Sequence, residues 1–446
     1  MADTFKPMAD FSVARSDFPA GFLFATATSA YQIEGHAHGG AGRTHWDTFA
    51  ETPGKVDRGE TGAIACDHYH RWEEDLDLIA NGGFDAYRFS TSWARILPDG
   101  MTVNPEGLDF YDRLLDGMVA RGIRPMATLY HWELPEALAA KGGWTVRDTP
   151  QRFADFAAIV ADRLGDRLFS VAPVNEPWCV AWLSHYHGYH APGLADLGAA
   201  TKAMHHVGLA HGLAVEVLRA KGVPNVGAAC NMEYALPARD TDADRAAATL
   251  YDGIYNRWFP GAMMAGSYPD DVLDGLAPHM PAGWQDDMKI VSQPLDWFGV
   301  NYYTCKRLTW GDGPWPDIAT VPGPLPKTDM DWEICPDGLD WLLTPLVRDF
   351  TGDTPLFITE NGLANPDTAT RPDGERIAYL DAHLKVVLDL IRSGVPIQGY
   401  TVWSLLDNYE WTLGYDKRFG LVHVDFDTQI RTPKASYRAL ARALAR

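Results

Sequence analysis

Short runs of apolar residues recur along the chain, and each run ends in polar or aromatic residues. The eight runs are Phe22–Ala27, Ala86–Ser90, Pro125–Tyr130, Val171–Asn175, Val226–Asn231, Trp297–Tyr303, Leu356–Glu360 and Ile397–Ser404. Nearly continuous apolar runs of this length are typical of parallel strands covered on both faces, whereas half-exposed antiparallel strands alternate apolar and polar residues. The pattern therefore predicts eight buried strands.

Segments with a helical repeat of about 3.6 residues lie between most of these runs. Clear examples are Leu108–Ala120, Arg152–Leu164, Met204–Ala220 and Ile377–Ile391. Many of the segments stop at a glycine just before the next strand, where a left-handed residue commonly ends a helix. These glycines are Gly83, Gly122, Gly165, Gly222 and Gly394. Strands that alternate with helices in this way predict an α/β fold, a (β/α)8 TIM barrel.

A doubly wound sheet is the alternative arrangement of alternating strands and helices. It would need a phosphate-binding glycine turn after the first strand, and Gly35–Gly42 contains no G-x-G-x-x-G leading into a helix. The stretch Gly311–Pro326, rich in proline and glycine, is expected to be a long loop after the sixth strand rather than a domain boundary. We therefore expect residues 1–446 to form one catalytic barrel domain with elaborated loops between strands and helices.

Composition excludes several classes of partner. The chain of 446 residues is 46% hydrophobic and 22% charged, which is an ordinary globular mixture. Its net charge of −21 repels phosphate backbones and anionic lipids, so we expect neither nucleic acid nor membrane as a partner. The 16 Trp, 18 Tyr and 18 Phe residues exceed the needs of a plain core. Flat apolar ligands, including the faces of sugars, would use such rings.

The five cysteines are far apart in the sequence, and no two form a C-x-x-C pair. Their odd number and their spacing argue against both a disulfide framework and a zinc ribbon. Residues 1–20 contain no apolar stretch that resembles a signal peptide, and nowhere do 18 apolar residues run together. We therefore expect a cytoplasmic protein.

Polar side chains gather where the predicted strands end, which is where the active site of a TIM barrel lies. The strand ends carry Gln32, Arg88, His131 with Trp132, Asn175 with Glu176, Asn231, Asn301 with Tyr303, Glu360 with Asn361, and Trp403. Any one of these residues is compatible with an ordinary turn after a strand. Two carboxylates, an arginine, a histidine and several amides on one rim indicate an active site.

The two carboxylates, Glu176 and Glu360, suit chemistry at an acetal. One carboxyl group would donate a proton to the leaving oxygen while the other attacks or stabilises the sugar carbon. The same residue types could bind a divalent metal, but no D-x-D or similar cluster supports such a site. The pairs His68-Tyr69-His70 and His185-Tyr186-His187 lack zinc-site spacing with a third ligand. We therefore expect no metal.

Further residues would complete a sugar site. Asn175 can hydrogen-bond a ring hydroxyl, and Arg88 and Tyr303 are donors that would keep Glu360 ionised. The segment from Trp403 to Trp411 places a glutamate between aromatic residues. An acid is rarely buried without a partner, and a pair of sugar hydroxyls is a suitable one. For a single tryptophan, packing in the core is the simpler interpretation.

Seven motifs follow one another along the chain: Ser29–Gly35, Tyr87–Ser90, Tyr130–Trp132, Asn175–Pro177, Asn301–Tyr303, Ile358–Gly362 and Trp403–Trp411. In this order they resemble the family 1 glycoside hydrolases, the β-glucosidase type of retaining enzyme. The resemblance extends from about Asp17 to about Leu440, nearly the whole chain.

The resemblance implies a (β/α)8 barrel, no cofactor, and retention of configuration through a glycosyl-enzyme. By match to the family motifs, Glu176 would be the acid/base and Glu360 the nucleophile. The residues implied to hold the sugar hydroxyls are Gln32, His131, Asn175, Glu410 and Trp411, with Trp403 as a stacking floor. The sugar-binding residues would be supported by Asn301 and Tyr303, and Glu360 would be oriented by Arg88. The aglycone side would be lined by Trp178 and Trp332.

Departures from the family pattern are few. Pro173 stands where the family commonly has threonine, and it is expected to loosen pairing of the fourth strand because it lacks a backbone donor. Glu176 is retained, unlike the myrosinase branch, which has glutamine. Glu410-Trp411 replaces the Ser/Lys/Tyr set of the phospho-glycosidase branch, and a carboxylate there would repel a sugar phosphate. The substrate is therefore expected to be unphosphorylated.

The expected activity is hydrolysis of terminal non-reducing β-glucosyl residues from cello-oligosaccharides or from aryl and alkyl β-glucosides, as in cellulose degradation. A β-galactosidase or β-fucosidase is the alternative within this class, because Glu410 can accept hydrogen bonds from a 4-hydroxyl in either orientation. A catalytically idle barrel that only binds sugars is the alternative from another class. Intact Glu176 and Glu360 argue against it.

Overall fold

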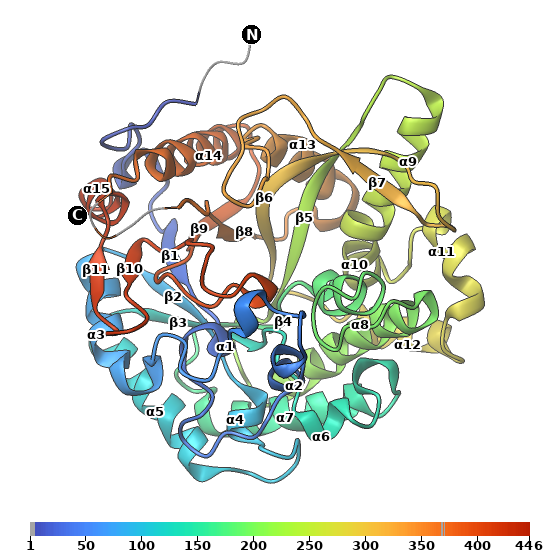
Figure 1. Cartoon of the computed structure of the whole chain (residues 1–446), viewed down its shortest axis with the longest axis horizontal. Coiled ribbons are helices and arrows are strands. Elements are labelled where there is room, and N and C mark those ends of the chain that lie inside the picture. The colour runs from blue at the N-terminus through green and yellow to red at the C-terminus, as the bar shows by residue number, and fades with distance from the viewer. Residues whose placement is uncertain (1–4, 367–368, 370) are drawn as a thin grey trace.

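The computed structural model describes residues 5–366, 369 and 371–446. Its centre is a sheet of parallel strands in the order β4-β3-β2-β1-β9-β8-β6-β5. These strands are β1 (Leu23–Ala27), β2 (Ala86–Ser90), β3 (Arg124–Tyr130), β4 (Ser170–Val174), β5 (Gly227–Pro237), β6 (Trp297–Trp310), β8 (Leu356–Asn361) and β9 (Ile397–Trp403). Helices surround them (Figure 1). The predicted (β/α)8 barrel is confirmed.

The barrel closes between β4 and β5, where pairing is weakest. Only isolated parallel bridges join these strands, Val171 with Val226 and Asn175 with Ala229. The N–H of Val171 donates to Asn225 O, just before β5. Pro173 lies two positions after Val171 and therefore also faces β5, but it has no N–H to donate. The expected loosening of the fourth strand is therefore seen at this seam.

The helices that cover the barrel begin earlier than the periodicity alone predicts. The long ones are α3 (His68–Asn81), α5 (Pro105–Ala120), α7 (Thr149–Leu164), α8 (Leu197–Ala220) and α14 (Gly374–Arg392). α5 and α7 start with a proline in the first turn, where the missing N–H costs no helical hydrogen bond. Asp196 caps α8 by accepting a hydrogen bond from Ala199 N.

Shorter helices occupy the loops and the chain end. They are α1 (Ala30–Ile33), α2 (His45–Glu51), α4 (Trp93–Ile96), α6 (Glu136–Ala139), α9 (Asp242–Asp252), α10 (Trp258–Pro260), α11 (Asp270–Leu276), α12 (Trp284–Val291), α13 (Gly338–Leu346) and α15 (Ala435–Ala443). Among the described helices, none is long and apolar enough to cross a membrane. Most of the glycines expected to end helices have positive φ, but Gly165 does not, because it keeps a right-handed helical conformation.

The sequence pattern predicts that the stretch Gly311–Pro326 is a long loop, but the structure shows that only part of it is. It contains β7 (Ile318–Val321), which pairs antiparallel with the end of β6 in the register Trp310 to Ile318. β5 and β6 both continue past the barrel rim and pair with each other there, and β7 adds to this extension (Figure 1). A second small sheet joins β10 (Val422–Val424) to β11 (Arg431–Pro433).

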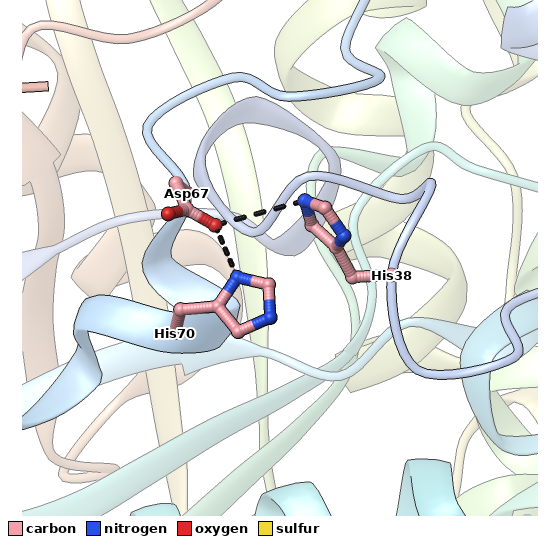
Figure 2. A group of neighbouring side chains, drawn as sticks. All are labelled: His38, Asp67 and His70. Carbon is pink, nitrogen blue, oxygen red and sulfur yellow. Dashed lines mark hydrogen bonds and ion pairs between the residues drawn. The ribbon is translucent and has the colours of Figure 1, made fainter. Parts of the chain in front are cut away.

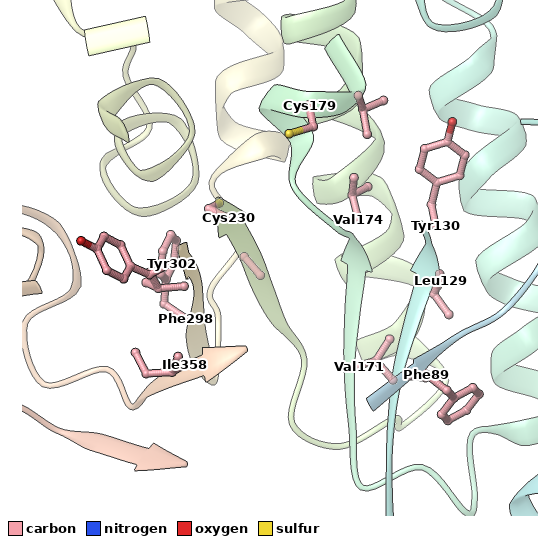
Figure 3. Close-up of a cluster of buried hydrophobic side chains, with 14 of the residues drawn as sticks. Phe89, Leu129, Tyr130, Val171, Val174, Cys179, Cys230, Phe298, Tyr302 and Ile358 are labelled. Carbon is pink, nitrogen blue, oxygen red and sulfur yellow. The ribbon is translucent and has the colours of Figure 1, made fainter. Parts of the chain in front are cut away.

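Two apolar layers hold the strands in place. A large cluster, which includes Leu129, Val171 and Ile358, packs the barrel strands against the helices (Figure 3). A small cluster made of alternate residues of the same strands, including Ala86 and Met126, fills the inside. Arg88 lies two residues beyond Ala86 and therefore points to the inside as well. Strand alternation thus places a charged side chain above an apolar floor.

Candidate active site

The C-terminal ends of the strands surround a cavity of about 490 Å³. Most of the predicted site residues line it, namely His131, Glu176, Trp178, Asn301, Tyr303, Trp332, Glu360, Trp403, Glu410 and Trp411. Gln32, Arg88 and Asn175 lie behind this lining, and each is hydrogen-bonded to it. The structure therefore brings every predicted site residue to one place, and the volume is ordinary for a small-molecule site.

Glu360 is held by two donors. Its Oε1 accepts from Arg88 Nη1 at 2.5 Å, and its Oε2 accepts from the hydroxyl of Tyr303 at 2.7 Å. The residue is 3% exposed. Burial raises the pKa of Glu360, while Arg88 and the Tyr303 hydroxyl oppose this rise by stabilising the charged form. The side chain is therefore fixed in one orientation with an ion pair to hold its negative charge.

Glu176 has a different environment. Its Oε1 accepts from Asn301 Nδ2 at 2.8 Å, and no cation forms an ion pair with it among the described residues. Burial and the nearby charge of Glu360 raise the pKa of Glu176 well above its ordinary value. At neutral pH, Glu176 thus favours the protonated form more than Glu360 does. Two carboxyl groups in one cavity are therefore prepared for opposite roles.

Asn301 and Asn175 connect the two carboxyl groups. Asn301 Nδ2 donates to Glu176 and also to Asn175 Oδ1, at 3.0 Å. The same Asn175 oxygen accepts from Arg88 Nη2 at 2.6 Å. The amide of Asn301 is oriented in turn by the Thr359 hydroxyl, which donates to its Oδ1 at 2.6 Å. One network of amides therefore positions both glutamates.

The same network fixes the protonation state of His131. Because Asn175 Oδ1 accepts from two donors, Asn175 Nδ2 must donate to His131 Nε2, which lies 3.2 Å away. Burial and the charge of Arg88 hold the pKa of His131 well below its ordinary value, so the ring is neutral. Its proton then sits on Nδ1, a buried atom without a protein partner. The His131 ring lines the cavity as a neutral polar group.

Glu410 lies above Gln32, a residue of α1. The Gln32 amide donates to Asn408 Oδ1 at 3.0 Å and to Tyr409 O at 2.8 Å, and Glu410 Oε2 is 3.5 Å from the same nitrogen. Burial together with the charges of Glu360 and Glu176 raises the pKa of Glu410 to about 8. A polar ligand that donates hydrogen bonds to this carboxylate would stabilise its charged form.

Aromatic rings form one wall of the cavity. The Trp403 ring stacks on His131, with 5.6 Å between ring centroids and an interplanar angle of 19°. Trp332 packs against Tyr303, at 5.4 Å. Trp178 and Tyr255 also line the cavity and contact each other, with 4.2 Å between ring centroids. These apolar faces are suited to the apolar faces of a sugar ring and of an attached group.

Three residues around the cavity have a left-handed backbone. Trp132, Glu176 and Trp411 have φ values of 84°, 48° and 55°. This conformation is costly for residues with a side chain, and it clusters at functional sites because it aims a side chain where regular structure would not. Gly362 allows the backbone after Glu360 to lie close to β9, since a Cβ at this position would lie 1.8 Å from the carbonyl oxygen of Trp403.

Several lining residues were missed or left without a role by the sequence analysis. Tyr251, Tyr255, Glu233 and Lys306 come from the β5 extension, the following helix and the β6 extension. The sequence pattern does not identify these residues, because they lie beyond the expected ends of the strands, where site residues were sought. Thr359 was also missed, although it directly precedes Glu360 and its inward position follows from strand alternation.

The two histidine motifs differ from each other in the structure. His185 Nδ1 lies 3.1 Å from the Ala181 carbonyl in the core, which is a structural role. His70, by contrast, has a third potential ligand beside it, because His38 and Asp67 offer atoms that all lie within 4.8 Å of one another. The pair His68 and His70 does not face one point, because His68 Nδ1 lies 2.8 Å from Asp75 Oδ2 in the core while His70 lies beside His38 and Asp67. His38 is too distant in sequence for a spacing rule to find it.

Comparisons with known proteins agree with this geometry. The family described as "Glycosyl hydrolase family 1" matches residues 14–444. A β-glucosidase of Agrobacterium sp. is 47% identical over 97% of both chains, and a bifunctional β-D-glucosidase/β-D-fucosidase of Bifidobacterium breve is 42% identical over 96% of this chain and 98% of its own. The family 1 β-glucosidase of Thermotoga maritima in complex with isofagomine lactam superposes with a TM-score of 0.93 at 41% identity, covering 97% of this chain and 99% of that one. The chain belongs to glycosyl hydrolase family 1.

Proposed function

We propose that this protein is a retaining β-glucosidase that removes terminal non-reducing β-D-glucosyl residues from unphosphorylated substrates. The observation that carries the proposal is the pair of buried carboxyl groups in one cavity, of which Glu360 is ion-paired with Arg88 and Glu176 is bound by the neutral amide of Asn301. Such a pair supplies a nucleophile and a proton donor to one glycosidic bond. The β-glucosidase relatives support the choice of sugar.

In the first half-reaction, Glu360 attacks the anomeric carbon and forms an ester bond to it. The bond from that carbon to the leaving oxygen breaks, and Glu176 gives its proton to this oxygen, so that the aglycone departs as a neutral alcohol. The raised pKa of Glu176 favours the protonated form that this step requires. The imidazole ring of His131 and the carboxylate of Glu410 bind hydroxyls of the sugar.

In the second half-reaction, water attacks the anomeric carbon and gives up a proton to Glu176. The ester to Glu360 breaks, and the carboxylate is restored. While Glu360 is esterified, its charge is absent, so one of the two causes that raise the pKa of Glu176 disappears. Glu176 is then ionised more readily, and the ionised form is the one that can accept the proton of water. The same pair therefore serves both half-reactions, and two inversions give net retention.

Glucosides are the proposed main substrates, with cello-oligosaccharides and aryl or alkyl β-glucosides as the classes that fit the aromatic wall. The carboxyl group of Glu410 at the sugar end, whose charged form is stabilised by hydroxyl donors, supports a neutral rather than a phosphorylated sugar. β-Fucoside activity is the second candidate, favoured by the resemblance to the bifunctional enzyme of Bifidobacterium breve. A hydroxyl of either 4-epimer can donate to Glu410.

We further propose that residues 1–446 act as one catalytic domain, that the enzyme works in the cytoplasm, and that it contributes to cellulose degradation by cleaving small oligosaccharides. All five cysteines are free and buried, which supports a reducing compartment. The oligosaccharide assignment is supported by the size of the cavity, which suits a short chain and not a polymer surface.

The proposal is tested by initial rates on p-nitrophenyl β-glucoside, β-galactoside, β-fucoside and β-glucoside 6-phosphate, with the anomer of the product followed by NMR. We expect fast turnover of the β-glucoside, with β-glucose as the first product, and no turnover of the phosphate. Absence of turnover on all four substrates in a folded sample would favour the idle sugar-binding barrel. Turnover of the galactoside or fucoside well above that of the glucoside would overturn the sugar assignment alone.

A further inference from the structure

The side chains of His38, Asp67 and His70 converge on one point outside the cavity (Figure 2). Oδ1 of Asp67 lies 2.6 Å from His70 Nδ1 and 3.6 Å from His38 Nε2. None of the three residues lines the cavity of the active site. We propose that this group is a binding site for a divalent transition-metal ion of the zinc type, separate from the sugar site.

The ligand set matches the chemistry of such an ion. Two imidazoles and one carboxylate are common donors to Zn²⁺, whereas Ca²⁺ and Mg²⁺ require mostly oxygen ligands. Imidazole binds a metal only in its neutral form. Burial, together with the nearby His70 and Arg95, holds the pKa of His38 below its ordinary value despite the carboxylate of Asp67. The His38 ring is therefore neutral and available near pH 7.

The distances are close to those of a metal site. With bonds of about 2.0–2.2 Å to nitrogen and oxygen, neighbouring tetrahedral ligands stand roughly 3.3–3.5 Å apart. The distance of 3.6 Å between Asp67 Oδ1 and His38 Nε2 is slightly longer than this separation. The distance of 2.6 Å between Asp67 and His70 is a hydrogen bond, in which the ring N–H donates to the carboxylate. On binding, the metal replaces this proton, which leaves to solvent, and the two atoms move apart by less than about 1 Å.

The backbone on both sides of the site is anchored. Arg95 Nη1 donates to the carbonyl oxygen of His38 at 2.6 Å, and the His38 ring stacks on Tyr69 at 6.0 Å between centroids. Asp67 directly precedes α3 and His70 lies in its first turn, and the 2.6 Å contact between Asp67 Oδ1 and His70 Nδ1 shows that their side chains meet. His70 is the adjustable ligand, because its side chain is 55% exposed. Asp67 N donates to Ile64 O at 2.8 Å, so the backbones of His38 and Asp67 are both held while the His70 side chain can adjust.

The nearest fixed charge does not prevent binding of a cation. Arg95 lies close to His38, but its Nε donates to Glu34 at 2.8 Å, so its charge is compensated within the core. The chain as a whole carries a net charge of −21, which attracts cations. Binding would join the loop that follows α1 to the start of α3, and it would therefore stabilise the fold at the first βα segment.

The test uses the full chain freed of metal by a chelator that is then removed. Titration with ZnCl₂ is followed by calorimetry, and thermal unfolding is measured with and without Zn²⁺. Co²⁺ in place of Zn²⁺ reports the ligand set through its visible absorption. We expect one tight ion per chain, a higher Tm when it is bound, and an absorption band typical of four-coordinate Co²⁺.

His38→Ala and His70→Ala each remove one ligand and should weaken this tight binding at least about tenfold, with loss of the Co²⁺ band. His279→Ala is the matched control, since this partly exposed histidine lies in the short 3-10 helix Ala277–His279, away from the site in sequence, and it should bind like the parent. His38→Gln serves if the alanine variant unfolds, as judged by far-UV circular dichroism. Equal binding by the parent and both ligand variants, which would mean that other surface histidines alone hold the ion, would overturn the proposal.

Discussion

Arg88 Nη1 donates to Oε1 of Glu360 across 2.5 Å, although the two residues are 272 positions apart in the chain. Arg88 belongs to β2 and Glu360 to β8, so the contact spans the inside of the barrel. Both side chains are almost fully buried. A buried charge without its partner is strongly unfavourable, so each of the two residues depends on the other. The ion pair stabilises the negative charge of Glu360.

Replacement of Arg88 by Met is expected to reduce kcat/KM for p-nitrophenyl β-glucoside by about 10²–10³, the usual loss when one prepositioned donor to a reacting group is removed. The pKa of Glu360 should rise, because the variant keeps the burial and loses the stabilising charge. The acid limb of the pH profile of kcat/KM should therefore move to higher pH. Arg124→Met, at the exposed start of β3, is the control. An acid limb at the same pH in Arg88→Met would contradict this account of Glu360.

Replacement of Glu360 by Gln is expected to lower the pKa of Glu176. The charge of Glu360 is one of the two main causes of the raised value, and glutamine removes it while keeping the shape. The pKa should still lie above that of an exposed glutamate, because burial remains. Carbon-13 NMR of labelled glutamate side chains over a pH series measures the change, with Glu216→Gln as the surface control. A pKa of Glu176 that stays the same or rises would show that Glu360 does not act on it.

His131 is expected to bind one particular hydroxyl of the sugar through its imidazole ring. In His131→Phe, this hydrogen bond is lost, and kcat/KM for the glucoside should fall about tenfold, in the range of one hydrogen bond in a buried site. The loss should disappear for the one monodeoxy glucoside that lacks the hydroxyl in question. Rates for the parent and the variant on each monodeoxy glucoside form a set of double-mutant cycles. An equal loss on every monodeoxy glucoside would show that His131 binds no particular hydroxyl.

Thr359 is expected to be a positioning residue that acts through Asn301. Thr359→Val removes the hydroxyl that fixes the Asn301 amide, so the bond from Asn301 to Glu176 should weaken. We expect kcat to fall to about a tenth, with KM nearly unchanged. The basic limb of the pH profile should also move, because this limb reports the ionisation of Glu176. Thr359→Ser keeps the hydroxyl and should restore both. A purely structural role would lower Tm without moving the basic limb, and Thr401→Val in β9 controls for that effect.

Much of the fold follows from the sequence because apolar runs and helical periodicity are local properties. The predicted starts and ends of β1 to β4 agree with the structure to within one residue. β5 and β6 run further than predicted, to Pro237 and Trp310, because beyond the rim they pair with each other and with β7 rather than with the barrel. Such pairing depends on neighbours in space, which local pattern does not contain.

The site, like the fold, has features that the local sequence predicts and features that depend on neighbours in space. Side-chain types at strand ends were enough to collect Glu176, Glu360 and Arg88 in one place, since parallel strands bring their carboxyl ends together. The tautomer of His131 was not predictable, because it depends on which donors occupy Asn175 Oδ1. The wall made by Tyr255 and Trp178 was only half predicted for a similar reason, since the two rings meet across separate loops.

The most direct test of the account is the identity of the residue that becomes covalently attached to the sugar. The protein is incubated with a 2-deoxy-2-fluoro β-glucoside that carries a good leaving group, and the product is analysed by intact mass and peptide mapping. We predict one fluoroglucosyl group per chain, on Glu360, and none on Glu360→Gln. Labelling of another residue, or full turnover of glucosides with no covalent adduct under these conditions, would contradict the assignment of Glu360 as the nucleophile.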